Sequence, residues 1–427
     1  MILLFVVAVF LITVFLGMPL VWAILLTAVL PILVFDLGYP LQALYLNFIG
    51  GVEPNHFLAI PLFIVAGELM SRGGVGLRII GFARAAFGFM PGGLGMVVVG
   101  ASMIFGGISG SAIADSAAIG SVMIKNMARE GYNKAFAAGL VAAAGTIGII
   151  IPPSIPMLIY GFVGNVSVAD LFLAGMVPGI MFGVAFMAVC YYVGKSTGCD
   201  PGGRTTTRAE LWSSFVGTAP ALFMPILILG GIFSGWVTPT EAAALAVVYG
   251  LVVTIFIYRD FRIRDLPQLM IDAFVTSATV MVVIGATTVL GWLITLEQMP
   301  QVLVGFVQDL SSSPWVFLIL VNLVLLVLGL VLDPVPAILL TAPLFLPTAQ
   351  AFGIDPVHLG VIMTCNVAVG LFTPPVGATL YVASRISGVG VLSIARRMGM
   401  LYFAAICALL LVTYVPAVSM TMVHLFR

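Results

Sequence analysis

Two aspartates, Asp115 and Asp333, interrupt long apolar stretches of a chain in which only 7% of residues are charged. Glycines lie close to both, and hydroxyl side chains lie close to Asp115. An ionised carboxylate at the centre of a bilayer costs about 2.5–3.5 kcal/mol, so a bound sodium ion or a proton would offset that cost. The alternative is that each aspartate caps the start of a half-helix by accepting backbone N–H bonds.

Two proline pairs, Pro152-Pro153 and Pro374-Pro375, lie inside long apolar segments. Consecutive prolines remove two N–H donors and clash with the preceding turn, so a helix must break there. Such a break frees carbonyl oxygens, which favour cations at C-terminal helix ends. We therefore predict two sodium sites, each formed by a turn and a broken helix, with the ligands Gly107, Ser109, Ser111, Asp115, Gly148, Ile151, Gly329, Asp333, Gly370, Thr373 and Val376.

Four polar residues in the broken segments are candidates for contact with a polar substrate. They are Thr146, Ser154, Thr364 and Asn366. Asn and Thr side chains also bridge membrane helices by hydrogen bonds, so a packing role explains these residue types equally well. The sequence leaves both interpretations open.

Other chemistry finds little support in the sequence. Three histidines and four cysteines are scattered without the spacing of a zinc, haem or redox site. Residues 194–196 resemble part of a phosphate loop, but Val189 occupies the place of the upstream glycine. We therefore predict no catalytic residue, no cofactor, no metal other than sodium and no nucleic-acid partner.

Membrane helices are the elements that must position these residues. The chain is 62% hydrophobic, whereas soluble domains are roughly 45–50% apolar and about 25% charged. An α-helical span needs roughly 20 apolar residues, and the period-two alternation of a β-barrel is missing. We predict an all-α polytopic protein surrounded by membrane lipid, with ten spans near residues 1–18, 19–36, 57–71, 135–163, 171–194, 213–234, 240–258, 268–296, 356–384 and 399–420.

The two regions that carry the candidate chemistry are copies of one unit. Six residues recur 222 positions later: Gly107, Gly131, Gly148, Pro152, Pro153 and Leu158 return as Gly329, Gly353, Gly370, Pro374, Pro375 and Leu380. Duplicated units of this kind are typical of transporters. At the same offset Ser111 aligns with Asp333, so the two sites need not have equal ion preference.

The repeat divides the chain into two halves. The first half is predicted at 1–196, with a re-entrant hairpin at 92–125 and a broken helix at 135–163. A polar linker follows at 197–210. The second half is predicted at 211–427, with a hairpin at 315–350 and a broken helix at 356–384.

Charge gives the orientation of these elements. If both hairpins enter and leave on one side, the five clusters of basic residues share one face, which the positive-inside rule makes cytoplasmic. Both termini then lie outside, and because each half contains five spans, the second repeat is inverted. Residues 1–34 lack a basic region and a cleavage site, so we expect them to be retained spans.

Four segments resemble the large membrane subunit of the tripartite ATP-independent periplasmic (TRAP) transporters. The most specific motifs are Gly-Thr-Ile-Gly-x-Ile-Ile-Pro-Pro-Ser and Thr-Pro-Pro-Val-Gly, and the segments are residues 107–121, 145–160, 238–244 and 370–377. The resemblance extends over the whole chain and looks closest to the sialic-acid branch.

The resemblance implies a subunit of a sodium-driven importer of organic acids, such as C4-dicarboxylates or sialic acid, in the bacterial inner membrane. A periplasmic binding protein would deliver the substrate, and a separate small four-helix subunit would complete the membrane unit. It also implies an elevator, in which residues 75–165 and 298–388 slide against a scaffold formed by the remainder.

Alternative functions fit the sequence less well. An intramembrane aspartyl protease pairs two aspartates that share a proton. Its glycine-x-glycine-aspartate signature is missing here, because Gly329 lies four residues before Asp333. A channel would be recognised by flux that needs no binding protein, and a non-transporting assembly subunit by copurifying quinone or other cofactors. The paired broken helices have no role in proteolysis, so transport is the predicted function.

Overall fold

The computed structural model describes residues 1–53, 55–72, 74–200, 202, 206–311 and 313–427, and within them it contains α-helices and no strand. The predicted all-α fold is confirmed. Part of the predicted linker, residues 201 and 203–205, lies outside the described residues.

The helices of the first half begin near the N-terminus and end at the linker. They are α1 (Ile2–Phe15), α2 (Leu20–Val34), α3 (Leu41–Val52), α4 (Ala59–Arg72), α5 (Val75–Phe87), α6 (Gly93–Ser109), α7 (Ala112–Arg129), α8 (Lys134–Gly145), α9 (Ile155–Val163) and α10 (Val168–Thr197). Short 3₁₀ segments at Asn55–Leu58 and Thr146–Ile149 extend α4 and α8.

The second half extends from the linker to the C-terminal end of the described chain. Its helices are α11 (Arg208–Phe233), α12 (Pro239–Leu251, continued by a π-helical Val252–Ile257), α13 (Leu266–Leu296, preceded by a 3₁₀ turn at Ile263–Asp265), α14 (Met299–Leu310), α15 (Pro314–Gly329), α16 (Pro334–Ala351), α17 (Pro356–Gly370), α18 (Ala378–Ser387), α19 (Val391–Arg396), α20 (Gly399–Tyr414) and α21 (Pro416–Phe426).

Several described helices are long and apolar enough to cross a membrane. Single helices of this kind are α10, α11, α12, α13 and α16. Three bent pairs, α4 with α5, α14 with α15 and α20 with α21, pass the same test when each pair is taken together. The predicted spans at 171–194, 213–234, 240–258 and 268–296 coincide with α10 to α13. The total of ten spans stays a prediction.

Helices break at the sites that the sequence indicated. Within the first predicted hairpin, α6 ends at Ser109 and its C-cap is Gly110, whose φ of +61° suits a residue without a Cβ. Within the second, residues 330–333 separate α15 from α16. Residues 150–154 separate the 3₁₀ end of α8 from α9, and residues 371–377 separate α17 from α18. Each of these last two breaks contains one of the proline pairs.

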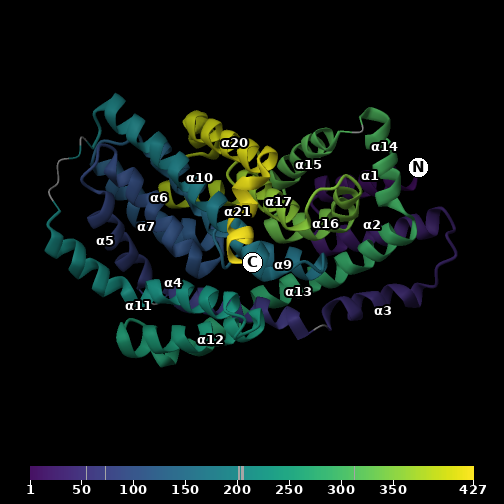
Figure 1. Ribbon diagram of the computed structural model, residues 1–427, viewed down its shortest axis with the longest axis horizontal. Coiled ribbons are helices and arrows are strands. Elements are labelled where there is room, and N and C mark those ends of the chain that lie inside the picture. Colours follow the sequence, from purple (N-terminus) through teal and green to yellow (C-terminus); the bar gives the residue numbers. More distant parts are fainter. Residues whose placement is uncertain (54, 73, 201, 203–205, 312) are drawn as a thin grey trace.

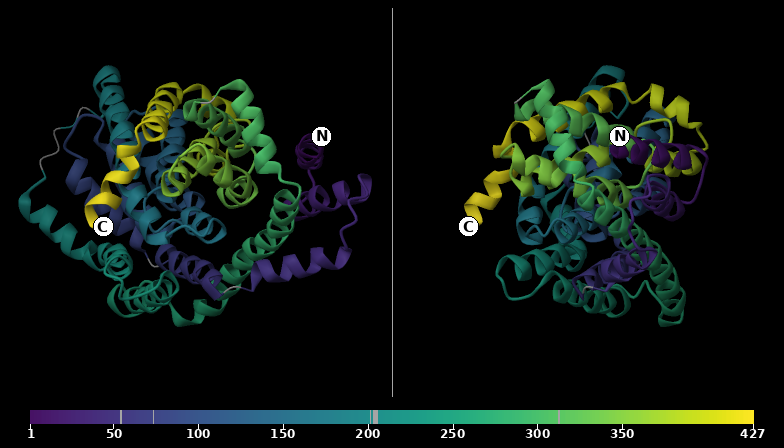
Figure 2. Two further views of the ribbon diagram at one scale, coloured as in Figure 1. Left: turned by 45° about the vertical axis from the view of Figure 1, so that its right-hand side comes forward. Right: turned by 90° about the vertical axis from the view of Figure 1, so that its right-hand side faces the viewer.

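The helices form an outer belt and an inner body. We call α2, α3, α4, α11, α12 and α13 the belt, because α12 packs on α4 and α11, and α13 packs on α2, α3 and α4. Its lower helices run along the bottom edge in Figure 1 and curve around the remaining helices in Figure 2. We call α6–α10 and α14–α21 the hairpin body, within which α9 of the first half packs on α16 and α17 of the second.

The hairpin body also includes helices outside the predicted hairpins and broken helices, among them α10, α20 and α21. The long helix α10 packs on α6, α17, α20 and α21, and α20 also packs on α17. Arg427 forms an ion pair with Asp170, which links the end of α21 to the start of α10. The hairpin body contacts the belt chiefly where α16 meets α13 and where α6 meets α4.

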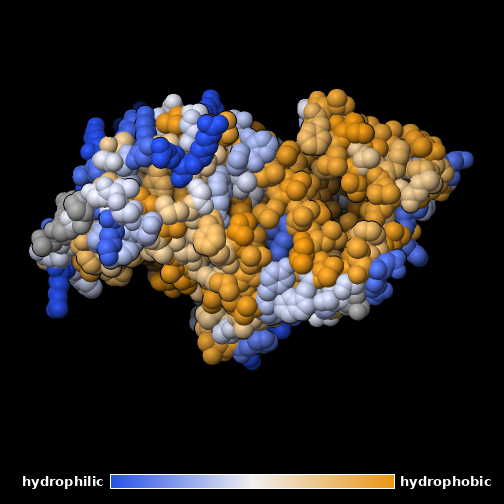
Figure 3. All heavy atoms as spheres, turned by 90° about the horizontal axis from the view of Figure 1, so that it is seen from above, coloured by the Kyte–Doolittle hydropathy of each residue, from blue (hydrophilic) through white to orange (hydrophobic). Residues whose placement is uncertain are grey.

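Hydrophilic and apolar residues of the surface gather at opposite ends of the long axis of the molecule. Hydrophilic residues gather on the left of Figure 3, where α10 ends and α11 begins, whereas the right-hand part over α14 to α16 is broadly apolar. A continuous apolar surface of this extent fits contact with lipid chains.

Candidate functional site

The first hairpin tip lies in the break between α8 and α9. A Cβ placed at Gly106 would collide with the Cα atom of Gly148, so the two backbones touch directly. A Cβ at Gly110 would lie 2.9 Å from the carbonyl oxygen of Pro153, and one at Gly107 would lie 3.6 Å from that of Pro152. Glycines are needed here because any larger residue would separate the turn from the broken helix.

Asp115 lies beside this contact and is fully buried. Its Oδ1 atom accepts a hydrogen bond from the Ser109 hydroxyl, and Ser109 Oγ in turn accepts from the Ser111 N–H at 3.1 Å. Its Oδ2 atom has no partner among the described residues and points at the backbone of Gly148, where an added Cβ would strike it. A buried carboxylate oxygen without a partner is costly, so this position calls for a cation or a proton.

The capping alternative does not account for either aspartate in this structure. Ser111 is the N-cap of α7, and its hydroxyl accepts from the Ala114 N–H at 3.4 Å. Asp115 lies in the first turn of that helix without capping it. Asp333 occupies the N-cap position of α16 but makes no side-chain cap bond.

The second hairpin tip meets the second broken helix in the same way. A Cβ at Gly370 would lie 2.5 Å from the Cα atom of Gly329, and the Gly377 N–H donates to the Leu330 carbonyl at 3.3 Å. The Thr373 hydroxyl donates to the Val369 carbonyl at 2.7 Å, which leaves lone pairs of its oxygen free. Val376 lies in the same break.

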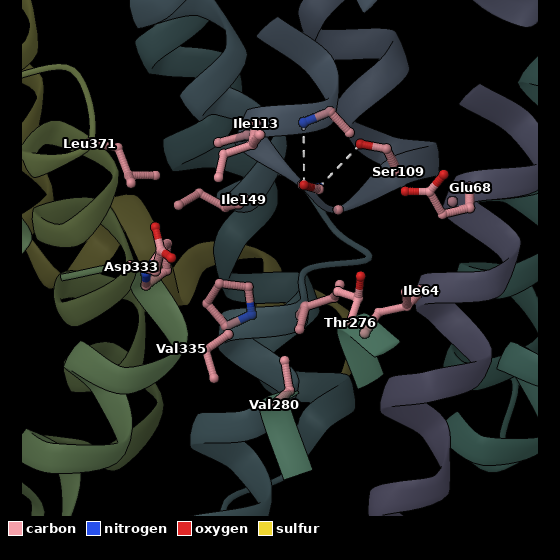
Figure 4. Close-up of a pocket in the computed structure, with 18 residues that line it drawn as sticks. Ile64, Glu68, Ser109, Ile113, Ile149, Thr276, Val280, Asp333, Val335 and Leu371 are labelled. Atoms are coloured by element: carbon pink, nitrogen blue, oxygen red, sulfur yellow. Dashed lines mark hydrogen bonds between the residues drawn. The ribbon is translucent and has the colours of Figure 1, made fainter. Parts of the chain in front are cut away.

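A cavity of about 180 Å³ lies between the two hairpin tips and the belt, and we call it the central cavity. Ser109, Ser111 and the start of α7 line one side, and Asp333 with the start of α16 lines another (Figure 4). Glu68 of α4 and Thr276 of α13 complete it from the belt. The cavity therefore joins both halves of the body to the belt.

Charge in the central cavity is acidic. Glu68 and Asp333 line it, and the described lining residues include no Lys or Arg. Arg72, one turn beyond Glu68, contacts the Glu68 carboxylate at 3.2 Å and Asp272 of α13 at 2.5 Å, so it ties α4 to α13 and is shared between two carboxylates. The start of α7, an 18-residue helix, is then the feature of the wall that favours an anion.

The four residues predicted to contact substrate lie outside the lining of the central cavity. Thr146 and Thr364 are buried and donate to carbonyls of their own helices at 2.8 and 2.9 Å. Asn366 is buried and donates to Asn322 of α15 at 2.7 Å. Ser154 is the N-cap of α9, and it borders a small cavity with Ser109 and Gly110.

Sequence reasoning missed the belt side of the cavity. Glu68 is the one charged residue within the predicted span 57–71, and that isolation could have drawn attention to it. Thr276 carries no such signal, because it is one of several threonines in α13. Asn322 was also missed, although a lone Asn in an apolar helix favours a polar partner on a neighbouring helix.

Comparison of the sequence with known families and curated proteins shows one family. The profile of the family described as "Tripartite ATP-independent periplasmic transporter, DctM component" matches residues 6–418. The C4-dicarboxylate TRAP transporter large permease protein DctM of Pseudomonas aeruginosa is 42% identical over 370 residues, covering 87% of this chain and 86% of its own. The sialic acid TRAP transporter large permease protein SiaM of Vibrio cholerae is 36% identical and covers 96% of both chains.

A solved structure shares the fold at low sequence identity. MtrF of Neisseria gonorrhoeae, described as illuminating a class of antimetabolite efflux pumps, aligns with a TM-score of 0.59 at 14% identity. The alignment covers 87% of this chain and 83% of MtrF. At this identity the likeness concerns the membrane-transporter fold alone.

Proposed function

Since this chain belongs to the family of large permease subunits of tripartite ATP-independent periplasmic transporters, we propose that it imports an organic acid by coupling the acid to sodium. The observation that carries the coupling is the unpaired, fully buried Oδ2 atom of Asp115 at the contact between Gly106 and Gly148. An ionised Asp115 without a bound cation would be an unpaired buried charge, and of the two partners that could remove it, a sodium ion or a proton, we propose sodium. Family membership disfavours a protease or a channel.

We call the contact between each hairpin tip and its broken helix a hairpin junction. Sodium would bind at both junctions. At the first, Asp115 supplies a carboxylate oxygen and Ser109 and Ser111 supply hydroxyls, with backbone oxygens from Gly107, Gly148 and Ile151. At the second, the proposed ligands are Gly329, Gly370, Thr373 and Val376, with Asp333 at the edge of the central cavity. Oxygen-only ligand sets suit a hard monovalent cation, and no group of three His, Cys, Asp or Glu side chains competes for another metal within the described chain.

The substrate would bind in the central cavity. The relatives are named for C4-dicarboxylate and sialic acid, and both compounds carry carboxylates. We propose that a substrate carboxylate lies at the start of α7 near Ser111, because Glu68 and Asp333 would repel it elsewhere. The side chains that would hold the broken helices in shape around this cavity are those of Thr146, Ser154, Thr364 and Asn366. They would come within reach of substrate only after a rearrangement.

Movement of the hairpin body against the belt would expose the cavity to the two sides alternately. The proposed moving part contains residues 75–165 and 298–388. Helices α10, α20 and α21 pack on that part, and the Arg427–Asp170 ion pair links two of them, so we propose that they move with it. The belt would form the scaffold in the bacterial inner membrane, with the N-terminus on the periplasmic side.

Two further components would complete the transporter. The family description names a tripartite system of which this chain is one component. A small four-helix membrane subunit and a periplasmic substrate-binding protein are the proposed partners, and the apolar outer surface is left for lipid and for the small subunit.

Reconstitution tests the proposal. The chain and its small subunit are placed in liposomes, and uptake of labelled sialic acid or a C4-dicarboxylate is measured with the loaded binding protein present. We expect uptake that needs an inward sodium gradient and the binding protein. Uptake that is equal in sodium and in potassium would overturn the coupling, and uptake of no organic acid would overturn the transport function.

A further inference from the structure

A pair of buried amides joins the first helix of the second hairpin to the second broken helix. Asn322 of α15 is 7% exposed, and Asn366 of α17 is fully buried. The Asn366 Nδ2 atom donates to the Asn322 Oδ1 atom at 2.7 Å and to the Ile362 carbonyl at 2.9 Å. Because a carbonyl can only accept, the second of these bonds fixes which atom of the Asn366 amide is the nitrogen. We call Asn322 and Asn366 the amide clasp.

The bonds of the clasp use half of the hydrogen-bonding capacity of each amide. An asparagine amide has two N–H donors on its nitrogen and two lone pairs on its oxygen. Both donors of Asn366 are occupied, and so are both lone pairs of the Asn322 oxygen, because the Thr413 hydroxyl of α20 also donates to that oxygen at 3.2 Å. The Asn322 Nδ2 atom and the Asn366 Oδ1 atom have no hydrogen-bond partner among the described residues. The clasp therefore leaves donors on one amide and lone pairs on its neighbour.

These two unpaired atoms have the chemistry of a water site. A molecule that pairs with both must accept from Asn322 and donate to Asn366, which a water molecule does and a simple ion cannot. The N–H donors of Asn322 would repel a sodium ion placed against the Asn366 oxygen. The hydroxyl of Tyr414, at the end of α20, lies next to the Asn322 amide and offers a third partner. Buried water molecules typically make about three hydrogen bonds of this kind.

The clasp lies next to the second hairpin junction. Asn366 precedes Gly370 by one helical turn, and Asn322 precedes Gly329 by two turns. Gly329 and Gly370 are the last residues of α15 and α17, and they pack on each other through backbone atoms alone. Hydrogen bonds across the clasp therefore fix how α15 meets α17 just before the junction.

The first half of the chain has no counterpart of the clasp. At the 222-residue offset, Asn322 and Asn366 align with Gly100 and Ala144. The first junction contains the buried Asp115 carboxylate instead. Packing of the duplicated helices therefore requires no amide at either position, and the two amides of the second copy call for an explanation of their own.

We propose that the amide clasp encloses one water molecule and that the hydrated clasp positions the second hairpin junction to bind sodium. Asn322 and Asn366 are positioning residues, because they would act on the ion through the contact between Gly329 and Gly370. With the water bound, both unpaired atoms gain a partner, and two bridges join α15 to α17, one direct and one through water. The inference rests on the proposed sodium coupling.

Radiolytic labelling tests for the water. The chain and its small subunit are reconstituted in liposomes in water enriched in oxygen-18 and exposed to an X-ray pulse. The pulse splits bound water into hydroxyl radicals, which modify adjacent side chains even where bulk water does not reach. We expect oxygen-18 label in α15 and α17 next to the clasp, and we expect it to disappear when Asn322→Leu and Asn366→Leu are combined.

The first half supplies the reference for this labelling. Residues 97–101 and 141–145 surround the aligned positions, are buried and contain no amide side chain, so we expect them to stay unlabelled. The bound water is overturned if the native chain shows no label next to the clasp, or if the native chain and the double variant are labelled equally there.

Sodium activation tests the positioning role. Asn322→Leu and Asn366→Leu, alone and combined, are compared by uptake at varied sodium with the loaded binding protein present. We expect each single variant to raise half-maximal sodium roughly fivefold and to retain uptake at saturating sodium, because it shifts the junction without removing a ligand. The double variant should be no worse than either single variant, since it leaves no buried amide unpaired. Asn322→Ser, whose hydroxyl can still accept from Asn366 and bind water, should restore most of the affinity.

Thr348→Val is the matched control. Thr348 of α16 is fully buried, and its hydroxyl donates to a carbonyl of its own helix at 2.8 Å, so the variant removes a buried polar group outside the clasp. The positioning role is overturned if the single clasp variants raise half-maximal sodium no more than Thr348→Val does, or if their effects add in the double variant. Native uptake that is indifferent to sodium would instead overturn the coupling, and the labelling would still decide whether the clasp holds water.

Discussion

At the first hairpin junction, Gly106 packs on Gly148 and the Asp115 carboxylate lies against the contact. At the second, Gly329 packs on Gly370, and the atoms nearest to a Cβ placed at either glycine are backbone atoms of these two residues and Val367. The backbone arrangement is therefore repeated, whereas the charged side chain belongs to one copy. Asp333, the acidic residue of the second tip, lies instead at the edge of the central cavity.

The difference shows what the duplicated unit conserves physically. Close contact between a glycine turn and a proline-broken helix needs only glycines and prolines, so both copies can form it. Ion preference depends on the side chains added to that frame. A buried carboxylate gives the first junction a full charge, while the second offers carbonyl and hydroxyl dipoles, so the two junctions should bind sodium with unequal strength.

The largest expected effect comes from Asp115→Asn, which keeps the shape of the side chain and removes its charge. We expect the sodium concentration for half-maximal uptake to rise roughly a hundredfold, because interactions with charged groups contribute up to about 3 kcal/mol. Ser121→Ala on the exposed side of the same helix is the control. A sodium activation curve identical to that of the native chain would show that the first junction is not the stronger site.

Glycine substitutions test whether the two junctions share one backbone design. Gly148→Ala would drive a methyl group into Asp115, and Gly370→Ala would drive one into the backbone of Gly329. We expect each to lower stability by about 1–3 kcal/mol and to reduce uptake strongly. Gly230→Ala in α11, where a Cβ has open space, should change neither the melting temperature nor uptake. Full activity of Gly148→Ala or of Gly370→Ala would show that the two junctions do not both need the close backbone contact.

The helix breaks that form this site could be predicted from the sequence because the residues that cause them act locally. Gly110 caps the end of α6, and a proline pair interrupts the backbone hydrogen bonds of a helix wherever it occurs. The helices therefore break at the predicted residues. The same local rules locate Asp115 beside a turn.

The walls of the cavity could not be predicted because they depend on packing between distant helices. Thr364 lies in a broken helix but turns its hydroxyl to its own backbone, and Asn366 pairs with Asn322, which lies 44 residues away in the chain. Glu68 reaches the cavity only because α4 packs beside α6. The hydrophobic periodicity of a sequence predicts that a helix forms. Tertiary contacts decide which face of that helix borders the cavity.

Ser109→Ala gives a smaller effect at the first junction. The variant removes the donor to Asp115 Oδ1 and leaves both carboxylate oxygens without a protein partner. We expect about a tenfold rise in half-maximal sodium, since one hydrogen bond to a charged group is lost while the charge remains. Ser109→Thr, which retains the hydroxyl, should restore most of the affinity in the same uptake assay. If alanine and threonine behave alike, the hydroxyl has no part in the ion site.

Asp333→Asn should have the smallest effect of the series. Asp333 is exposed to the central cavity and makes no cap bond, so water screens its charge and its contribution to ion binding should be at most about 1 kcal/mol, or roughly fivefold in half-maximal sodium. At normal expression the sodium dependence of uptake should therefore weaken, but less than in Asp115→Asn. An unchanged activation curve would exclude Asp333 from the second site. An effect larger than that of Asp115→Asn would reverse the order of the two junctions, because the exposed carboxylate, not the buried one, would then control the coupling.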